Sequence, residues 1–352
     1  MKINKSIIFL YSRLPDYFYQ AIVCFTTRYN INAVIFRLRD DPSTSYTFIE
    51  TPLVRVYYRD DVDVAKVISE ANPAALVLSS WRDKEYREIC RQYFSKLPVI
   101  LALDNPFEGT LKQRVLSVVS KIAIRNICNR AWVPGPSQYQ YARNLGYRQQ
   151  DILFNLYSAN TPVFNKAFQE SVQRKSAAFP RQIVYVGRLV EYKQPHILAE
   201  VFSEINEHCS LQWKLIIAGE GPLKASVIAK KHANVLFRDF IKPTDLPEFY
   251  KTAGVFCLPS INEHWGVAVH EAVAAGAPLL LSNTVQSASE FLIDGYNGFA
   301  FDATSRSSLK NALNRMMSQS DEELTAMSAN SYSLSSRISP DTWAATLNSV
   351  IN

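Results

Sequence analysis

Short, almost wholly apolar runs alternate along the chain with longer segments in which apolar residues recur every three or four positions. The runs in the first half are Ser6–Tyr11, Ile31–Leu38, Val54–Tyr58, Ala75–Ser79, Val99–Leu103 and Ala131–Val133. Such runs are typical of strands that are buried on both faces of a parallel sheet. The segments between them, such as Tyr17–Tyr29, Val64–Glu70 and Lys84–Phe94, predict helices that cover the sheet.

A second alternation follows a looser, polar stretch at Asn160–Gln182, which predicts a linker. Its expected strands are Gln182–Val186, Trp213–Ala218, Val235–Phe237, Val255–Leu258, Pro278–Leu281 and Gly298–Phe301. The pattern therefore predicts an α/β protein with two domains, residues 1–170 and 178–335, each built on a parallel sheet. Residues 336–352 contain a helix with an apolar face, which we expect to pack back on the first domain.

Composition narrows the class of protein. Of the 352 residues, 47% are hydrophobic and 20% are charged, which is ordinary for a globular protein with a sizeable core. The five cysteines are scattered without a CxxC pair, which favours a reducing cytoplasm over a disulfide framework or a structural zinc site. The first apolar run is too short for a membrane span and lacks a cleavage site, so it predicts a buried strand.

The charge is unevenly distributed. The formal net charge is +6, and residues 1–176 carry 24 Lys/Arg and 15 Asp/Glu, whereas residues 177–352 carry 14 and 17. A basic first half indicates an anionic partner. Its segment Leu111–Arg130 has five basic residues and no acid, which fits either a solvated helix on the sheet or contact with an anionic membrane surface. Nucleic acid is disfavoured, because neither a recognised motif nor interleaved aromatic residues accompany the charge.

Two glycine-containing turns follow expected strands of the second half. Gly187–Lys193 follows the first of them, and its two cations, Arg188 and Lys193, could clamp a diphosphate. Gly219–Pro222 follows the second and forms a tight turn at which a ligand could approach the backbone. Taken alone, two such cations are more often surface charge.

Two glutamates follow the expected strand Val255–Leu258. Glu263 and Glu271 stand eight positions apart, so on one α-helix both side chains would project from nearly the same face. We expect Glu263 and Gly266 at the helix N-terminus, where free N–H groups and the helix dipole favour a phosphate or an anionic transition state. A solvated helix face is the alternative. Because the carboxyl ends of parallel strands share one edge of a sheet, the three segments together indicate a nucleotide-sugar site.

The segments VGRLVEYK, IAGEGP and the stretch with two glutamates, in this order, resemble the C-terminal domain of family 4 glycosyltransferases. The resemblance covers about residues 182–302, and WVPGPSQYQYARNLGY (132–147) resembles the segment before the interdomain linker of these enzymes. It implies the GT-B fold, in which two Rossmann-like domains face each other across a cleft, and a retaining transfer. It implies no metal and no cofactor, because protein cations meet the diphosphate and the nucleotide-sugar is a substrate.

The resemblance also implies roles for four charged residues. Arg188 and Lys193 would bind the donor diphosphate and stabilise it as the leaving group. Glu271 would accept hydrogen bonds from the ribose hydroxyls. Glu263 would contact hydroxyls of the transferred sugar.

Backbone and apolar contacts complete the implied donor site. Its further residues are Gly187, Gly219, Phe240, Ile241, His264, Trp265, Gly266 and Val267. Phe240 and Ile241 would frame the base, and the amides of His264–Val267 would hold sugar and phosphate. The simplest alternative for His264 and Trp265 is that they are helix and core residues, although Trp265 could instead line the sugar pocket.

The first half departs from the family at two strand ends. Ser12-Arg13-Leu14-Pro15 stands in place of a Gly-Gly motif, and Asp104-Asn105 stands in place of a frequent histidine. We expect Asp104 to be a catalytic residue that faces the cleft and binds an acceptor or sugar hydroxyl. A plain turn is the alternative for this pair.

The function expected from residues and resemblance is that of a cytoplasmic, metal-independent hexosyltransferase. It would move a hexose with retention from a UDP- or GDP-sugar to a glycan or lipid-linked acceptor in surface polysaccharide biosynthesis, with a peripheral position on the membrane as an option. Two other readings stay open. One is a nucleotide-sugar epimerase or hydrolase on the same fold, and the other is a non-catalytic module that binds a nucleotide-sugar.

Overall fold

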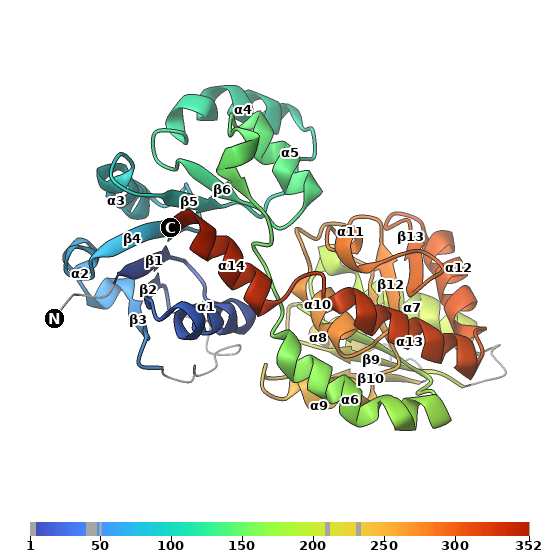
Figure 1. The fold of residues 1–352 in the computed structure, drawn as a ribbon. Helices are drawn as coiled ribbons and strands as arrows, with labels where there is room; N and C mark the ends of the chain where they lie inside the picture. The colour runs from blue at the N-terminus through green and yellow to red at the C-terminus, as the bar shows by residue number, and fades with distance from the viewer. Residues whose placement is uncertain (1–4, 40–47, 49–50, 208–211, 230–233, 352) are drawn as a thin grey trace. The chain divides into compact units, whose positions relative to one another are not determined.

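The computed structural model describes residues 5–39, 48, 51–207, 212–229 and 234–351, which form two compact units (Figure 1). Unit 1 comprises Met1–Ala159 and Ile338–Asn352, and unit 2 comprises Asn160–Arg337. Each unit is built on one parallel sheet with helices on both faces, as the alternating pattern predicted. None of the helices in the described residues combines the length and the apolar content needed to cross a bilayer.

Unit 1 contains a seven-stranded sheet with the order β3-β2-β1-β4-β5-β6-β7. The strands are β1 (Ser6–Leu10), β2 (Asn32–Arg37), β3 (Val54–Tyr58), β4 (Pro73–Leu78), β5 (Val99–Ala102), β6 (Arg130–Trp132) and β7 (Ile152–Leu153). The helices are α1 (Asp16–Tyr29), α2 (Val64–Glu70), α3 (Lys84–Tyr93), α4 (Leu111–Ala123), α5 (Pro136–Asn144) and α14 (Pro340–Ile351). Each strand expected here is present within two residues at its ends. The sequence pattern missed β7, which has only two residues.

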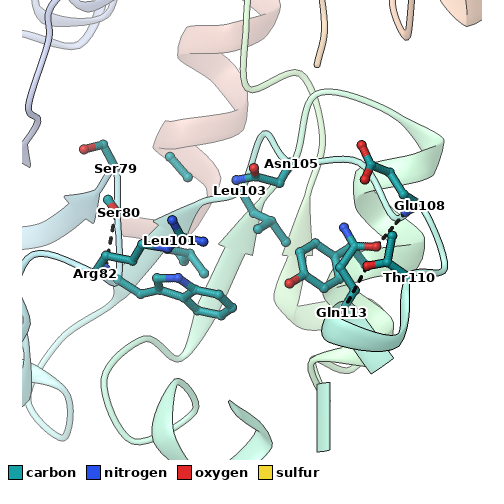
Figure 2. A pocket seen from close by; sticks show the side chains of 12 residues that line it. Ser79, Ser80, Arg82, Leu101, Leu103, Asn105, Glu108, Thr110 and Gln113 are labelled. Atoms are coloured by element: carbon teal, nitrogen blue, oxygen red, sulfur yellow. Dashed lines mark hydrogen bonds between the residues drawn. The ribbon is translucent and has the colours of Figure 1, made fainter. Parts of the chain in front are cut away.

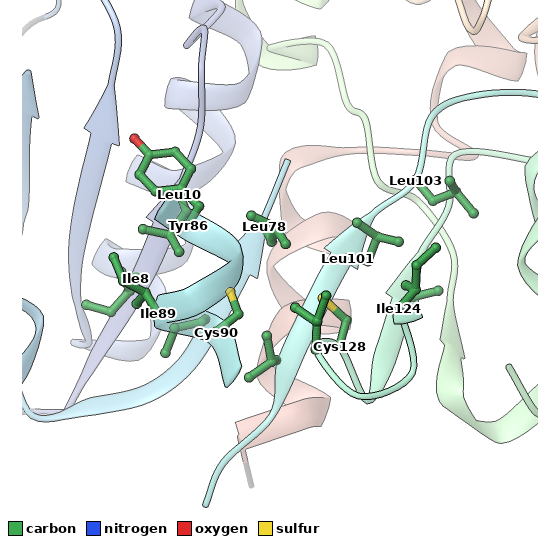
Figure 3. Close-up of a cluster of buried hydrophobic side chains, with 14 of the residues drawn as sticks. Ile8, Leu10, Leu78, Tyr86, Ile89, Cys90, Leu101, Leu103, Ile124 and Cys128 are labelled. Atoms are coloured by element: carbon green, nitrogen blue, oxygen red, sulfur yellow. The ribbon is translucent and has the colours of Figure 1, made fainter. Parts of the chain in front are cut away.

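Successive side chains of each strand enter opposite cores of unit 1. Ile8 and Leu10 of β1 lie in the core on one face of the sheet, and Ile7 and Phe9 lie in the core on the other. Figure 3 shows the first core, which also contains buried cysteines such as Cys90. The four cysteines within the described ranges are free thiols, and burial raises the pKa of Cys90 to about 12.

Helix α14 belongs to the second core of unit 1, although it follows unit 2 in the sequence. The ring of Trp343 is fully buried and lies 6.4 Å from the ring of Phe9 and 5.4 Å from that of Phe18. Its indole Nε1 donates to the carbonyl of Leu156 at 2.9 Å. The last helix therefore completes the core that the first strand begins.

Unit 2 contains a six-stranded parallel sheet with the order β10-β9-β8-β11-β12-β13. The strands are β8 (Gln182–Val186), β9 (Lys214–Ala218), β10 (Val235–Arg238), β11 (Val255–Leu258), β12 (Leu279–Ser282) and β13 (Gly298–Phe301). The helices are α6 (Thr161–Ala177), α7 (Pro195–Asn206), α8 (Lys224–Ala229), α9 (Leu246–Thr252), α10 (Val267–Ala274), α11 (Ala288–Phe291), α12 (Arg306–Met317) and α13 (Asp321–Ser335). Each strand expected in the second half is present.

The stretch expected to be a linker is instead helix α6 of unit 2. Pro162 occupies its first turn, and Phe164 and Phe168 are buried on one side of it. The polar residues between these positions conceal the helical spacing. The structural boundary between the units therefore lies at residues 159 and 160 rather than between residues 170 and 178.

Candidate functional site

The sheet of unit 2 has a topological switch point between β8 and β11. From β8 the chain continues through β9 and β10 on one side, and it then crosses to β11, β12 and β13 on the other. Sheets of this topology bind ligands beyond the carboxyl ends of the strands at the switch point. Two of the predicted segments lie here, because Gly187–Lys193 follows β8 and Glu263–Val267 follows β11.

Lys193 and Glu263 form an ion pair at this switch point. The Nζ of Lys193 lies 2.7 Å from Oε2 of Glu263, and their side chains are only 14% and 13% exposed. The hydroxyl of Ser260 donates to the same carboxylate oxygen at 3.3 Å. The fold thus brings together a cation and a carboxylate that are 70 positions apart in the sequence.

The backbone that carries Glu263 is held by the end of β12. Glu263 forms an isolated parallel bridge with Val285. The hydroxyls of Ser282 and Thr284 both donate to the carbonyl of Ser260, each at 2.5 Å. The position of the carboxylate is therefore fixed by the neighbouring strand end as well as by the ion pair.

Glu263 lies outside the helix that the spacing predicted for it. Helix α10 begins at Val267, and Gly266 before it adopts a left-handed φ of 93°. Glu271 lies inside α10, so the expectation that the two acids share one helix face is wrong. A Cβ on Gly266 would lie 3.2 Å from Cγ of Glu263, so glycine at this turn lets the helix begin beside the carboxylate. The positive end of the α10 dipole therefore starts next to the ion pair.

The loop after β8 packs on the glycine turn after β9. A Cβ on Gly219 would lie 1.9 Å from the carbonyl oxygen of Gly187, so only glycine permits this approach. The amide of Leu189 donates to the carbonyl of Glu220 at 2.8 Å. From the other side, the hydroxyl of the buried Tyr185 donates to the backbone carbonyl of Arg188 at 2.7 Å. The two turns therefore form one rigid edge.

Arg188 is exposed, and its guanidinium donates to the hydroxyl of Tyr192. Its Cζ lies 5.8 Å from the centre of the Tyr192 ring. Lys193, the next residue after Tyr192, pairs with Glu263 instead. In the described contacts the two predicted cations thus occupy one loop but have different partners.

Trp265 is a core residue rather than a lining residue. Its side chain is 2% exposed, and its indole Nε1 has no hydrogen-bond partner within the described residues. Its backbone carbonyl accepts from the amide of Ser287 at 3.0 Å. The side chain therefore cannot line a sugar pocket in this conformation, and His264 beside it is partly exposed.

The residues predicted to contact the nucleoside lie on two other elements. Glu271 is partly exposed in α10, and its charge adds to the effect of burial in raising the pKa of Tyr250 in α9. Phe240 and Ile241 are partly buried in the loop after β10, at the carboxyl edge of the same sheet. Their roles toward a nucleotide stay a prediction.

Asp104 in unit 1 follows β5 and is surrounded by tyrosines. Its Oδ2 accepts from the hydroxyl of Tyr157 at 3.1 Å, and its Oδ1 accepts from the side chain of Asn105 at 3.2 Å. Burial raises the pKa of Tyr11 well above its ordinary value, and Tyr17 and Asp104 add to this effect. The hydroxyl of Tyr11 is buried and has no hydrogen-bond partner within the described residues. Tyr157 is therefore the tyrosine that donates a hydrogen bond to Asp104 in the described contacts.

A cavity of about 330 Å³ lies beyond the ends of β4 and β5 in unit 1. Ser79, Ser80, Trp81, Arg82, Leu101, Ala102, Leu103, Asn105, Glu108, Thr110, Gln113 and Tyr141 line it. Figure 2 shows Arg82 on one side of the cavity and Glu108 on the other. Burial raises the pKa of Tyr141, and the charge of Arg82 opposes this rise. Asn105 lines the cavity, whereas Asp104 is not among the lining residues.

Sequence reasoning missed these features of unit 1. The sequence pattern assigns no role to Tyr157 or to the run Ser79–Arg82. The signal for the run is an aromatic residue among hydroxyl and cationic groups directly after a strand. Nothing in the sequence links Tyr157 to Asp104, which is 53 positions away, because only the order of β5, β6 and β7 brings their ends together.

Comparison with known proteins gives one family. Residues 168–334, which lie within unit 2, match the family described as Glycosyl transferases group 1. The chain is 32% identical over 109 residues to an uncharacterized glycosyltransferase of Methanocaldococcus jannaschii, which is 29% of this chain and 27% of that protein. It is 20% identical over 204 residues to a Campylobacter jejuni enzyme, which is 58% of this chain and 54% of that protein. The chain thus spans about a quarter to about half of these relatives.

The Campylobacter relative is the GalNAc-alpha-(1->4)-GalNAc-alpha-(1->3)-diNAcBac-PP-undecaprenol alpha-1,4-N-acetyl-D-galactosaminyltransferase. Among solved structures, Anabaena HepE in complex with UDP and glucose has a TM-score of 0.71 and 16% sequence identity. The match covers 98% of this chain and 99% of HepE. At this identity the likeness shows the fold alone, which is the GT-B fold of two Rossmann-like domains that the sequence predicted.

Proposed function

We propose that this chain, whose residues 168–334 match the glycosyl transferases group 1 family, is a retaining glycosyltransferase. It transfers a hexose from a UDP- or GDP-sugar to a glycan or lipid-linked acceptor in surface polysaccharide biosynthesis. The observation that carries the proposal is the Lys193–Glu263 pair at the switch point of unit 2. A partly buried cation and carboxylate, beside glycine turns and a helix N-terminus, match a diphosphate joined to a polyhydroxylated ring. HepE, with its bound UDP and glucose, supports this class of donor.

The donor diphosphate lies against the loop after β8. Arg188 and Lys193 meet its charge, and the turns at Gly187 and Gly219 let it approach the backbone. The bond between the anomeric carbon and the phosphate breaks, and the diphosphate leaves with the electron pair. These two cations of one loop stabilise the departing charge, so the reaction needs no metal ion. The acceptor hydroxyl forms the new bond on the same face of the sugar, and its proton passes to an oxygen of the departing diphosphate.

The two carboxylates and the remaining donor-site residues contact the sugar and the nucleoside. Glu263 accepts hydrogen bonds from hydroxyls of the hexose, and the amides of Gly266 and Val267 at the start of α10 hold sugar and phosphate. Glu271 accepts from the ribose hydroxyls. Phe240 and Ile241 frame the base at the end of β10. Trp265 contributes backbone only, because its side chain is buried.

The acceptor binds to unit 1. Its cavity beyond β4 and β5 combines Arg82, Ser79 and Ser80 with the rings of Trp81 and Tyr141, which suits a sugar ring with hydroxyl or anionic substituents. Asp104 lies at the end of β5 and binds an acceptor hydroxyl. The Campylobacter relative, whose name gives an acceptor carried on undecaprenyl diphosphate, supports a lipid-linked glycan.

The test measures release of UDP or GDP from a panel of nucleotide-sugars, with and without a lipid-diphosphate-linked glycan. We expect release that depends on the acceptor, a product that retains the anomeric configuration by NMR, and activity that persists in EDTA. Lys193→Ala should lower turnover by about 10² or more. Lys214→Ala, which changes an exposed lysine at the opposite end of β9, should not.

The same panel separates the competing functions. Release of nucleotide at the same rate without acceptor would indicate a hydrolase or an epimerase. Tight binding without release of nucleotide from any donor would indicate a binding module. Activity that is lost in EDTA and restored by magnesium would contradict the roles of both Arg188 and Lys193.

A further inference from the structure

Gln194, the residue after Lys193, has a backbone conformation that a glutamine rarely adopts. Its φ is 50° and its ψ is 38°, which places it in the left-handed region. This region disfavours most side chains, so the conformation costs free energy that glycine would avoid. Strained residues of this kind cluster at functional sites and persist where the surrounding contacts hold them. The contacts that hold Gln194 are therefore informative about the neighbouring site.

The Gln194 side chain ties the loop after β8 to the ends of two other strands. With its nitrogen turned toward them, its amide donates to the carbonyl of Pro259 at 3.0 Å and to that of Ala303 at 3.2 Å. Pro259 follows β11, Ala303 lies shortly after β13, and both residues are buried. Buried carbonyls require a donor, and one amide group supplies two N–H groups. The Gln194 amide thus joins three strand ends at the carboxyl edge of the sheet.

The loop is attached on both sides of Lys193. On the side before it, the carbonyl of Tyr192 accepts from the amide of Ile261 at 2.8 Å. On the side after it, the Gln194 amide makes the contacts described above. Both links lead to the segment just before Glu263, the residue whose carboxylate pairs with the Nζ of Lys193 at 2.7 Å. The backbone that carries the cation is thus fixed relative to the carboxylate.

We propose that Gln194 is a positioning residue for the transfer reaction, because its amide holds Lys193 where the ammonium group meets the diphosphate. This inference rests on the proposed function, in which Lys193 stabilises the leaving diphosphate. A lysine side chain has many rotamers, so fixing the backbone on both sides limits where the ammonium group can lie. A displacement of about 1 Å can lower a rate by about 100-fold. The placement of Lys193 therefore accounts for a glutamine at a turn where glycine would fit more easily.

The experiment compares two variants of the full chain that lack the amide. Gln194→Gly also relieves the left-handed strain, whereas Gln194→Met keeps it. We expect both to lower turnover by about tenfold or more and to weaken binding of UDP and GDP by at least about threefold. The melting temperature of Gln194→Gly should stay within about 4 °C of the wild type, because the relieved strain offsets the lost hydrogen bonds.

A matched control is available at the opposite edge of the same sheet. Asn234 precedes β10, is exposed, and has a left-handed φ of 62°. Asn234→Gly therefore relieves the same kind of backbone strain and removes a side-chain amide away from the site. It should change neither turnover nor nucleotide affinity.

A second background separates positioning from support of the fold. If Gln194 acts through Lys193, adding Gln194→Gly to Lys193→Ala should change neither turnover nor nucleotide affinity further. Equal losses in both backgrounds would overturn the proposal, as would wild-type turnover and affinity in Gln194→Gly. Unfolding of Gln194→Gly at the assay temperature would overturn it as well, because Gln194 would then support the fold.

Measuring binding as well as turnover keeps this inference distinct from the proposed function. A wild type that binds UDP or GDP without transferring a sugar contradicts the proposed function, while the affinities of the Gln194 and Lys193 variants still test the positioning role. Transfer by the wild type together with full activity of Gln194→Gly contradicts the positioning role alone. A wild type that binds neither nucleotide contradicts both.

Discussion

Lys193 and Glu263 form one ion pair, but removing the lysine and removing the glutamate should have opposite effects on the binding of a nucleoside diphosphate. At the observed 2.7 Å the gross attraction is about 6 kcal/mol at an effective dielectric constant of 20, most of which desolvation offsets. The charge-assisted hydrogen bond that remains contributes about 1.5–3 kcal/mol. In the free protein this interaction competes with a diphosphate for the cation. Lys193→Ala should therefore weaken binding of the nucleoside diphosphate by about 10- to 100-fold, since a ligand charge loses its partner.

Glu263→Gln should have the reverse effect on the same ligand. It leaves Lys193 without its carboxylate, so the nucleoside diphosphate, which has no sugar, should bind more tightly, by up to about tenfold. With Lys193→Ala already present, Glu263→Gln should change that affinity little. Turnover of the intact nucleotide-sugar should fall in all three variants, because Lys193 is proposed to stabilise the leaving diphosphate and Glu263 to hold the sugar. The ion pair thus predicts a coupling between the two substitutions, not only two losses.

Isothermal calorimetry with UDP and GDP on the four proteins of this cycle measures the coupling directly. Gln in place of Glu263 is isosteric, and the end of β12 holds its backbone, so the loop should keep its position. Lys214→Ala is the matched control for a lost lysine. If Glu263→Gln weakens the nucleoside diphosphate as much as Lys193→Ala does, Glu263 contacts the nucleotide and the proposed division of roles is wrong. If the two effects simply add, the ion pair has no bearing on ligand binding.

Three further predictions test other parts of the molecule. Gly219→Ala should lower both melting temperature and turnover, because its Cβ would lie 1.9 Å from the Gly187 oxygen. Gly295→Ala, where the Cβ has nothing within 4 Å and φ is 76°, should keep activity. Equal effects of the two substitutions would show that backbone strain at a glycine, not contact with Gly187, lowers turnover. Asp104→Ala should reduce transfer to the acceptor by about tenfold or more at unchanged donor affinity. The control Asp60→Ala, which changes an exposed aspartate of the same unit, should not reduce transfer. Full transfer in Asp104→Ala would make Asp104 a turn residue. Burial lowers the pKa of Lys175 from 10.5 to about 8, so its proton is bound more weakly in the folded than in the unfolded state. The free energy of unfolding should therefore increase as the pH rises from 8 to 10.5, by up to about 3 kcal/mol. Calorimetric unfolding at pH 7 and 10 should show this rise in the wild type and in the exposed control Lys166→Met but not in Lys175→Met, and the same pH dependence in all three would refute it.

The strand positions and the convergence of Arg188, Lys193 and Glu263 on one sheet edge could be predicted because both follow from periodicity and parallel topology. Continuous apolar runs have few alternatives to buried parallel strands, and parallel strands end at one edge. The placement of Glu263 could not be predicted in the same way. A spacing of eight residues predicts a shared face only if both residues lie in one helix. The left-handed turn at Gly266 separates Glu263 from the helix that contains Glu271. The carboxylate reaches the site through the loop and its bridge to Val285, which no local pattern specifies.

Helix α4 shows most clearly where periodicity stops being informative. The sequence gives an aliphatic face and a polar face, and burial of the aliphatic face is the usual outcome, so the pattern favoured packing on the sheet. In unit 1, Ile124, Ile127 and Cys128 after the helix enter the core. Gln113 accepts a hydrogen bond from the amide of Glu108 in the loop beside the cavity, and the hydroxyl of Ser117 donates to the carbonyl of Gln113. Which face of an amphipathic helix is free is decided by what its neighbours already occupy. The same helix therefore lines the cavity of unit 1 through Gln113 and leaves Leu111, Val115, Val118 and Val119 exposed.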